Sequence, residues 1–180
     1  MRTALILVDI QKDYFPGGRM ELSGSASAGL KAGQLLQRFR AKGLPVFHVQ
    51  HLSVQPGATF FLPNTDGVQI HASVAPLPLE PVVQKHFPNS FRDTELLGKL
   101  KALEITQLVI CGMMSHMCID TTVRAAFDQG FSCILAQDAC ATRDLSFGGR
   151  TLPAADVHAS FMAALGMVFA TVVDADAVTV

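Results

Sequence analysis

The sequence predicts an α/β protein, in which a mainly parallel six-stranded sheet is covered by helices on both faces in a Rossmann-like, three-layer α/β/α sandwich. Two observations carry this prediction. Apolar runs of strand length alternate with segments of helical periodicity along the whole chain of 180 residues, as in parallel sheets with crossover helices. No repeat, linker or low-complexity stretch interrupts the alternation, so we expect one domain over residues 1–180.

The N-terminal half is predicted to form a strand, a helix and a second strand. Residues 3–9 are a continuous apolar run, as expected of a strand buried on both faces. Residues 25–43 carry leucines at helical spacing and end at a glycine, which predicts a helix. A second apolar run at 45–52 predicts the next strand. The stretch 53–80 is rich in proline and lacks periodicity, and connections of this length are often functional loops or lids.

The C-terminal half continues the alternation. Asp93 is expected to cap one helix at its N-terminus, and Pro153 is expected in the first turn of another. A glycine break at Gly112 separates a buried strand from the helix that carries Cys118. These patterns predict strands at 81–85, 108–111, 131–139 and 167–175, and helices at 93–103, 117–129 and 153–165.

Composition argues against several classes of partner. The formal net charge is −1 without a basic run, so neither nucleic acid nor membrane is an expected partner. No apolar run reaches the ~20 residues of a membrane span, and Asp9 interrupts the apolar start in a way that signal peptides do not. The four cysteines form no C-x-x-C pair, so we expect free thiols and a cytoplasmic protein. Charged residues make up only 16%, which favours a homodimer or higher homo-oligomer.

Three reactive side chains are predicted at one edge of the sheet, because parallel strands place their ligand sites beyond their C-terminal ends. The first strand ends on Asp9, the third on Lys85, and the fourth leads to Cys118. A helix N-terminus stabilises a thiolate, so we expect the pKa of Cys118 to be lowered. Its free amides can also hold an oxyanion.

Each of these residues alone has a simpler structural explanation. Asp9 could form a turn, Lys85 could reach water, and Cys118 could pack as a small apolar residue. Cys111 and Cys133 fit that last explanation, since both lie within apolar strand runs. The joint placement of a carboxylate, an ammonium and a thiol at one edge favours a catalytic site.

Four motifs in this order resemble the isochorismatase-like cysteine hydrolase superfamily, which includes nicotinamidases and N-carbamoylsarcosine amidohydrolase. They are LILVDIQKDYFPGG (5–18), VVQKHFPNSFRDTEL (82–96), LVICGMMSHMCIDTTVRAA (108–126) and ILAQDACAT (134–142). The resemblance implies a strand order of 3-2-1-4-5-6 and a catalytic triad of Asp9, Lys85 and Cys118. It also implies a cis peptide bond between Met113 and Met114, with the Met114 and Cys118 amides as an oxyanion hole.

The function implied is hydrolysis of a small-molecule amide or related C–N bond through a covalent thioester. Isochorismatase itself cleaves a vinyl ether without a cysteine nucleophile, so Cys118 favours C–N hydrolysis. Two alternatives remain: ether or ester hydrolysis in the same fold, and a flavodoxin-like domain that binds a small molecule without catalysis. The absence of G-x-G-x-x-G and of a phosphate loop argues against the second alternative. The sequence does not identify the substrate.

No metal or other cofactor is expected. Nicotinamidases bind a metal through an Asp-x-His pattern after the second strand, and His51 and Ser53 occupy those two positions here. His48 and His51 should face opposite sides of a straight strand, and His71 lies in an irregular region.

The resemblance also suggests side chains that line the substrate pocket. Phe15 and Phe91 follow the motifs of Asp9 and Lys85, where the family has aromatic pocket walls. His116 precedes Cys118 by two positions and is expected at the entrance. The proline-rich stretch supplies Phe60–Phe61, which could cover the pocket or pack against a partner subunit.

Overall fold

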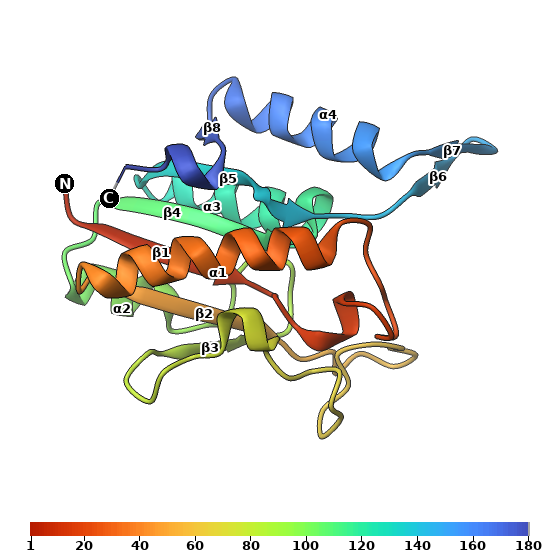
Figure 1. Ribbon diagram of the computed structural model, residues 1–180, viewed down its shortest axis with the longest axis horizontal. Coiled ribbons are helices and arrows are strands. Elements are labelled where there is room, and N and C mark those ends of the chain that lie inside the picture. Colours follow the sequence, from red (N-terminus) through yellow and green to blue (C-terminus); the bar gives the residue numbers. More distant parts are fainter. Residues whose placement is uncertain (180) are drawn as a thin grey trace.

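Six strands form one sheet in the computed structural model, which describes residues 1–179 (Figure 1). The strands are β1 (Thr3–Val8), β2 (Val46–His51), β3 (Val82–Lys85), β4 (Gln107–Met113), β5 (Ser132–Ala141) and β8 (Thr171–Val173). Every pairing within the sheet is parallel, and the order is β3-β2-β1-β4-β5-β8. The predicted order is confirmed, with β8 as the sixth strand.

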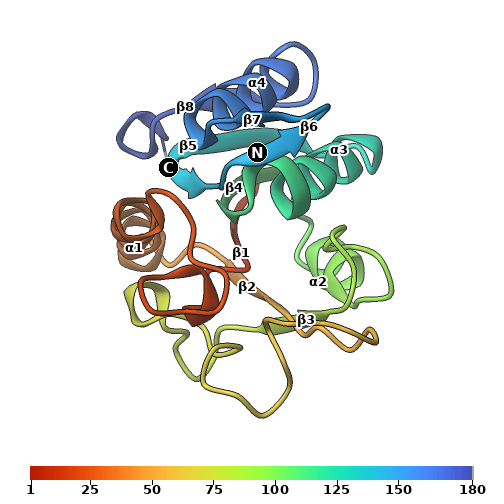
Figure 2. The same ribbon diagram turned by 90° about the vertical axis from the view of Figure 1, so that its right-hand side faces the viewer.

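Helices cover both faces of the sheet, as predicted (Figure 2). They are α1 (Ser25–Ala41), α2 (Leu96–Ala102), α3 (Asp120–Asp128) and α4 (Ala154–Gly166). One face carries α1, and the other carries α2 and α3, with α4 beside α3 near β8. None of the helices in residues 1–179 is long and apolar enough to cross a membrane.

An antiparallel hairpin that was not predicted lies between β5 and α4. Its strands are β6 (Leu145–Phe147) and β7 (Arg150–Leu152), and it projects from one end of the molecule (Figure 1). Gly148 and Gly149 both have positive φ, as the turn between such short strands requires. Strands of three residues are too short to show a clear periodicity in the sequence.

Several element ends differ from the prediction. Asp93 does not cap α2, because its backbone is left-handed (φ +55°) and the helix begins only at Leu96. Pro153 is the residue before α4 instead of a member of its first turn. The last strand is shorter than predicted, because residues 167–170 form the turn that leaves α4, with Met167 and Val168 exposed.

The core lies between the sheet and the helices. Residues 4–8 of β1 are each at most 2% exposed, as expected of a continuous apolar run in a central strand. All four cysteines are free and buried, with Cys111 inside β4 and Cys133 inside β5.

The central strands approach closely at the edge that carries the predicted site. Gly112 of β4 pairs with Val8 of β1, and a Cβ atom on this glycine would lie 2.0 Å from the Val8 carbonyl oxygen. Its φ of +133° is also one that other residues rarely adopt. Glycine is therefore required here, and it brings the segment after β4 close to Asp9.

Asp13 fastens the proline-rich stretch 53–80 to the turn after β1. Its buried carboxylate accepts hydrogen bonds from the amides of Phe61 (2.7 Å) and Arg19 (3.2 Å). Its own amide donates to the carbonyl oxygen of Gly67 at 2.9 Å. The stretch is therefore held over the C-terminal ends of the strands.

A largely buried ion pair joins α1 to the end of this stretch. The Glu80 carboxylate accepts two hydrogen bonds from the Arg40 guanidinium, both at 2.7 Å. It also accepts one from Nε2 of His48 and one from the amide of Leu77, both at 2.9 Å. Burial by itself would raise the pKa of Glu80, but these hydrogen bonds outweigh it and lower the pKa to about 2.

Replacing Glu80 by glutamine should lower the free energy of unfolding at neutral pH by about 3 kcal/mol, because Arg40 loses its counter-charge. The folded pKa of about 2 lies below the ~4.3 of an unfolded glutamate. The ion pair thus contributes fully above that unfolded value, and its contribution is lost as the pH falls toward the folded value. Urea denaturation of both proteins at neutral pH and near pH ~3 measures this, and a difference that does not shrink in acid would contradict it.

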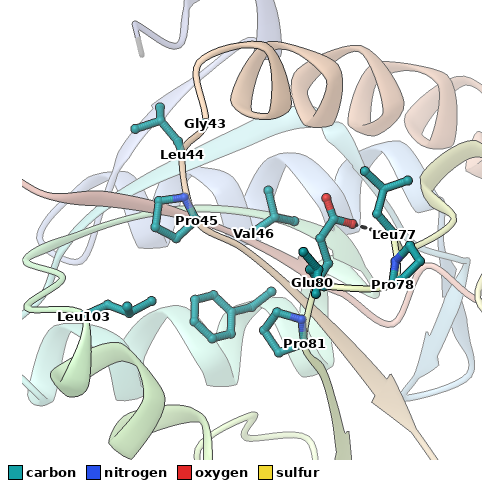
Figure 3. Close-up of a pocket in the computed structure, with 11 residues that line it drawn as sticks. Gly43, Leu44, Pro45, Val46, Leu77, Pro78, Glu80, Pro81 and Leu103 are labelled. Atoms are coloured by element: carbon teal, nitrogen blue, oxygen red, sulfur yellow. Dashed lines mark hydrogen bonds between the residues drawn. The ribbon is translucent and has the colours of Figure 1, made fainter.

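Glu80 also borders a cavity of about 640 Å³ (Figure 3). Most of its lining is apolar, with Leu44 and Val46 on one side and Leu77 beside Glu80 on the other. Because Val46 begins β2, this cavity lies at the edge of the sheet opposite the predicted site.

Candidate active site

Three neighbouring strands end on polar side chains at one edge of the sheet. β3 ends at Lys85, β2 ends at His51, and β1 ends directly before Asp9. Lys85 and His51 are also register partners. Cys118 reaches the same edge from the turn after β4. The structure therefore brings the three residues of the predicted triad together and adds His51 to them.

The ammonium group of Lys85 is the centre of this cluster. Its Nζ lies 2.8 Å from Oδ2 of Asp9 and 3.2 Å from Sγ of Cys118, and it donates to the carbonyl oxygen of Phe87 at 3.1 Å. Asp9 is 0% exposed, Lys85 1% and Cys118 5%. Burial lowers the pKa of Lys85, but the charges of Asp9 and Cys118 outweigh it and raise the pKa above its ordinary value. The amine is therefore a permanent cation.

The Asp9 carboxylate lies close to the Cys118 sulfur and has oxygen lone pairs available to accept a proton. Apart from the ion pair with Lys85, neither of its oxygens has a hydrogen-bond partner within residues 1–179. One oxygen lies within 4.8 Å of the Cys118 sulfur. The residue has a left-handed backbone (φ +53°), which directs the chain away from the strand line directly after β1.

The turn that carries Cys118 differs from the predicted helix start at residue 117. A single π-helical turn, Ser115–Ile119, precedes α3. The carbonyl oxygen of Met114 accepts the amide of Ile119 at 3.2 Å, five residues along the chain. Such wide turns often occur at functional sites.

Neighbouring elements fix the segment before this turn. The Met113–Met114 peptide bond is cis, as the resemblance implied. Ser115 is fully buried, donates to the carbonyl oxygen of Ala141 at 3.3 Å and bonds Nδ1 of His158 at 2.9 Å. These contacts tie the predicted oxyanion donors, the amides of Met114 and Cys118, to β5 and α4.

The prediction that the pKa of Cys118 is lowered was wrong. Burial raises the pKa of this thiol above its ordinary value, and Asp9 raises it further, against the opposing effect of Lys85. Asp9 and Lys85 already balance each other, so a thiolate would add an uncompensated charge to an enclosed site. The resting thiol therefore keeps its proton, and a base must remove it during attack.

His51 belongs to this site, although sequence reasoning considered it only as a possible metal ligand. Its Nδ1 lies 3.0 Å from Nζ of Lys85. The Gln11 side chain holds its backbone on both sides, accepting from the His51 amide at 2.7 Å and donating to its carbonyl oxygen at 2.9 Å. Burial lowers the pKa of His51 to about 4, so the imidazole is neutral near pH ~7. Its position at a strand end beside Lys85 was the available signal.

The residues present do not fit the metal site of nicotinamidases. Three possible ligand atoms lie within 4.8 Å of one another, those of Asp9, His51 and Cys118. The ammonium of Lys85 lies 2.8 to 3.2 Å from one atom of each of these three side chains, and so it takes the place of a cation among them. His48 and His71 have other partners, Glu80 and Ser73.

The rings predicted to line the pocket have neighbours outside this cluster. Phe15 stacks on His71, with centroids 3.6 Å apart, and borders a separate cavity of about 480 Å³. Phe91 packs against Phe131, which precedes β5 at the opposite edge of the sheet. His116 bonds Oγ1 of Thr142 through its Nδ1 at 2.6 Å. A role for Phe15, Phe91 and His116 in substrate binding stays a prediction.

Aromatic rings from the turn after β1 and from the proline-rich stretch lie beside the cluster. The Phe61 ring lies 4.5 Å from that of Tyr14 and 6.0 Å from that of His51, between centroids. Burial raises the pKa of Tyr14, and the charges of Cys118 and Asp9 raise it further, because the phenol lies near them. The proline-rich stretch therefore places Phe61 beside Tyr14 and His51, and a covering role for Phe60 and Phe61 stays a prediction.

Comparisons with known proteins agree with this geometry. The family model of the isochorismatase domain matches residues 3–177. The uncharacterized isochorismatase family protein YddQ of Bacillus subtilis is 54% identical over 172 residues, which cover 96% of each chain. A crystal structure from Oleispira antarctica, assigned to the isochorismatase hydrolases, superposes with a TM-score of 0.94 at 51% identity, over 97% of this chain and 94% of that one. Streptothricin hydrolase of Streptomyces noursei is 37% identical over 79% of this chain and 50% of its own length.

Proposed function

Since the chain belongs to the isochorismatase family of hydrolases, we propose that it hydrolyses a small-molecule amide or a related C–N bond through a thioester on Cys118. The observation that carries this proposal is the contact of the Lys85 ammonium with both Asp9 and Cys118, at 2.8 and 3.2 Å, in an enclosed cluster. A carboxylate, a permanent cation and a thiol in contact provide a base, an electrostatic support and a nucleophile.

Acylation begins when the substrate carbonyl lies against Sγ of Cys118. As the sulfur attacks the carbonyl carbon, its proton passes to Asp9, and the carbonyl oxygen becomes an oxyanion that the Met114 and Cys118 amides stabilise. Asp9 then gives the proton to the leaving nitrogen as the C–N bond breaks. The products of this half-reaction are the free amine and a thioester.

Deacylation uses the same groups. Asp9 takes a proton from a water molecule, whose oxygen attacks the thioester carbon. The C–S bond breaks, and the proton on Asp9 returns to the sulfur, which restores the neutral thiol. Throughout both halves the Lys85 ammonium stabilises whichever neighbour carries the negative charge, first the carboxylate and then the sulfur. One water is consumed, and an acid and an amine are formed.

The presence of Cys118 favours C–N hydrolysis over the ether cleavage that gives the family its name. A flavodoxin-like binding domain finds no support, because the chain is a member of a hydrolase family.

A screen of small primary amides, carbamoyl compounds and lactams tests the proposal. We expect ammonia or amine release, monitored by a coupled assay, from at least one class, and an acyl adduct on Cys118 by mass spectrometry after rapid quenching. Hydrolysis of esters or vinyl ethers alone, with no amide turned over, would support the alternative chemistry. Release that occurs without an adduct and survives loss of the thiol would refute the thioester.

A further inference from the structure

The contacts of Lys85 determine where His51 carries its proton. An ammonium group offers only donors, so His51 Nδ1, 3.0 Å from Nζ, has to be the acceptor. Burial, with a smaller contribution from the Lys85 charge, lowers the pKa of the imidazole, so the ring is neutral and can accept this hydrogen bond. The remaining proton of the neutral ring therefore sits on Nε2, on the side of the ring away from the ammonium.

This Nε2–H group is fixed in place and open. The Gln11 side chain clamps the His51 backbone, and the Phe61 ring lies 6.0 Å away, between centroids. Nε2 has no hydrogen-bond partner within the described residues 1–179 and is not one of their enclosed, unpartnered side-chain atoms. The His51 side chain is 16% exposed beside an otherwise closed cluster.

His51 is not needed to satisfy the ammonium of Lys85. That group has three protons and four acceptors within 3.2 Å, so Asp9, Cys118 and the Phe87 carbonyl oxygen would still accept all three if His51 were lost. A histidine held by Gln11 with one ring nitrogen against the cluster and the other facing outward is suited to a ligand. The donor is uncharged, and the charges of Asp9 and Lys85 balance, so a neutral acceptor suits this donor better than a charged group.

We propose that the Nε2–H group of His51 binds the acyl side of the substrate and selects acyl groups that carry a neutral hydrogen-bond acceptor near the reacting carbonyl. This inference rests on the proposed function, since it concerns the substrate of the same site. It assigns the substrate class as acyl groups with an ether, carbonyl or ring-nitrogen acceptor, in preference to purely alkyl ones.

Two substitutions separate this role from support of Lys85. Asparagine places a polar atom near the position of Nδ1, so His51→Asn can keep the contact with Lys85 but loses the outward donor. Glutamine places its amide nitrogen near the position of Nε2, so His51→Gln keeps the outward donor. The probes are p-nitrophenyl methoxyacetate and p-nitrophenyl butyrate, whose acyl chains differ only by an ether oxygen in place of a methylene.

The measured quantity is kcat/KM for the methoxyacetyl ester divided by kcat/KM for the butyryl ester. Dividing the ratio of each variant by that of the wild type cancels the difference in intrinsic reactivity between the two esters. We expect His51→Asn to lower this ratio about fivefold to tenfold, mainly through KM, and His51→Gln to keep it within about twofold. An unchanged ratio in His51→Asn would overturn the proposal, as would a loss in His51→Gln alone, which would mean that His51 serves only Lys85.

A second measurement does not depend on turnover. Long-range ¹H–¹⁵N correlation spectra of the wild-type protein near neutral pH should show His51 as the neutral Nε2–H tautomer, and the Nδ1–H tautomer would overturn the proposal. Cys118→Ala separates this question from the reaction itself. If that variant still hydrolysed both esters like wild type, the thioester mechanism would fail whatever the His51 spectra showed.

Discussion

Cys118→Ala is expected to abolish turnover, by on the order of 10⁴-fold or more in kcat, and to leave the fold intact. The sulfur is the only group of the cluster that can attack a carbonyl carbon while Asp9 accepts its proton. The oxyanion donors alone cannot compensate, because without a nucleophile no oxyanion forms. Steady-state kinetics on the amide found in the screen measures the loss, and circular dichroism checks the fold.

Cys133→Ala is the matched control for this variant. Cys133 is also a buried free thiol, but it lies near the start of β5, at the edge of the sheet away from the cluster. We expect this control to keep its activity and to lose only a little stability. Activity that survives in Cys118→Ala, or that falls equally in both variants, would be incompatible with a thioester on Cys118.

The fold was predictable because its central strands β1 and β4 contain continuous apolar runs. The central strand β1 is enclosed on both faces, so its run is unbroken in the sequence. The hairpin of β6 and β7 was missed because each strand has three residues, most of them exposed. The last strand was predicted to begin too early, because Met167 and Val168 are apolar although they lie on the surface. Apolar character indicates a strand only where burial makes it necessary.

The three residues of the triad were predictable from the sequence, but the electrostatics of the site and the role of His51 were not. Strand ends and the family resemblance together indicated Asp9, Lys85 and Cys118. The sequence places Cys118 near a helix N-terminus, which by itself favours a thiolate. It does not reveal that the thiol is buried beside a carboxylate, and this burial and the Asp9 charge decide the direction of the pKa shift. The role of His51 was missed for a similar reason, since it follows from the register of β2 against β3 and from the hydrogen bonds with Gln11.

Asp9→Asn is expected to change two properties of Cys118 in opposite directions. Asparagine cannot take the thiol proton, so kcat should fall by roughly 10²–10⁴-fold. The carboxylate also raises the pKa of the thiol in the wild-type protein, whereas Lys85 lowers it. Without the carboxylate, a thiolate would balance the Lys85 ammonium, so the pKa of Cys118 should fall and its alkylation by iodoacetamide at neutral pH should become faster.

Cys118 of the wild-type protein should be alkylated slowly at neutral pH and faster as the pH rises toward its raised pKa. In Asp9→Asn, the same increase in rate should occur at lower pH. Asparagine tolerates the left-handed backbone of Asp9, so the turn after β1 should persist. The three core cysteines report on that, because partial unfolding would expose Cys111, Cys133 and Cys140 to the reagent as well. Peptide mapping should show faster labelling confined to Cys118, together with lost turnover. This combination requires that one carboxylate both suppresses the thiolate at rest and receives the thiol proton during attack. Labelling that slows, or that spreads to the core thiols, would contradict this assignment of Asp9.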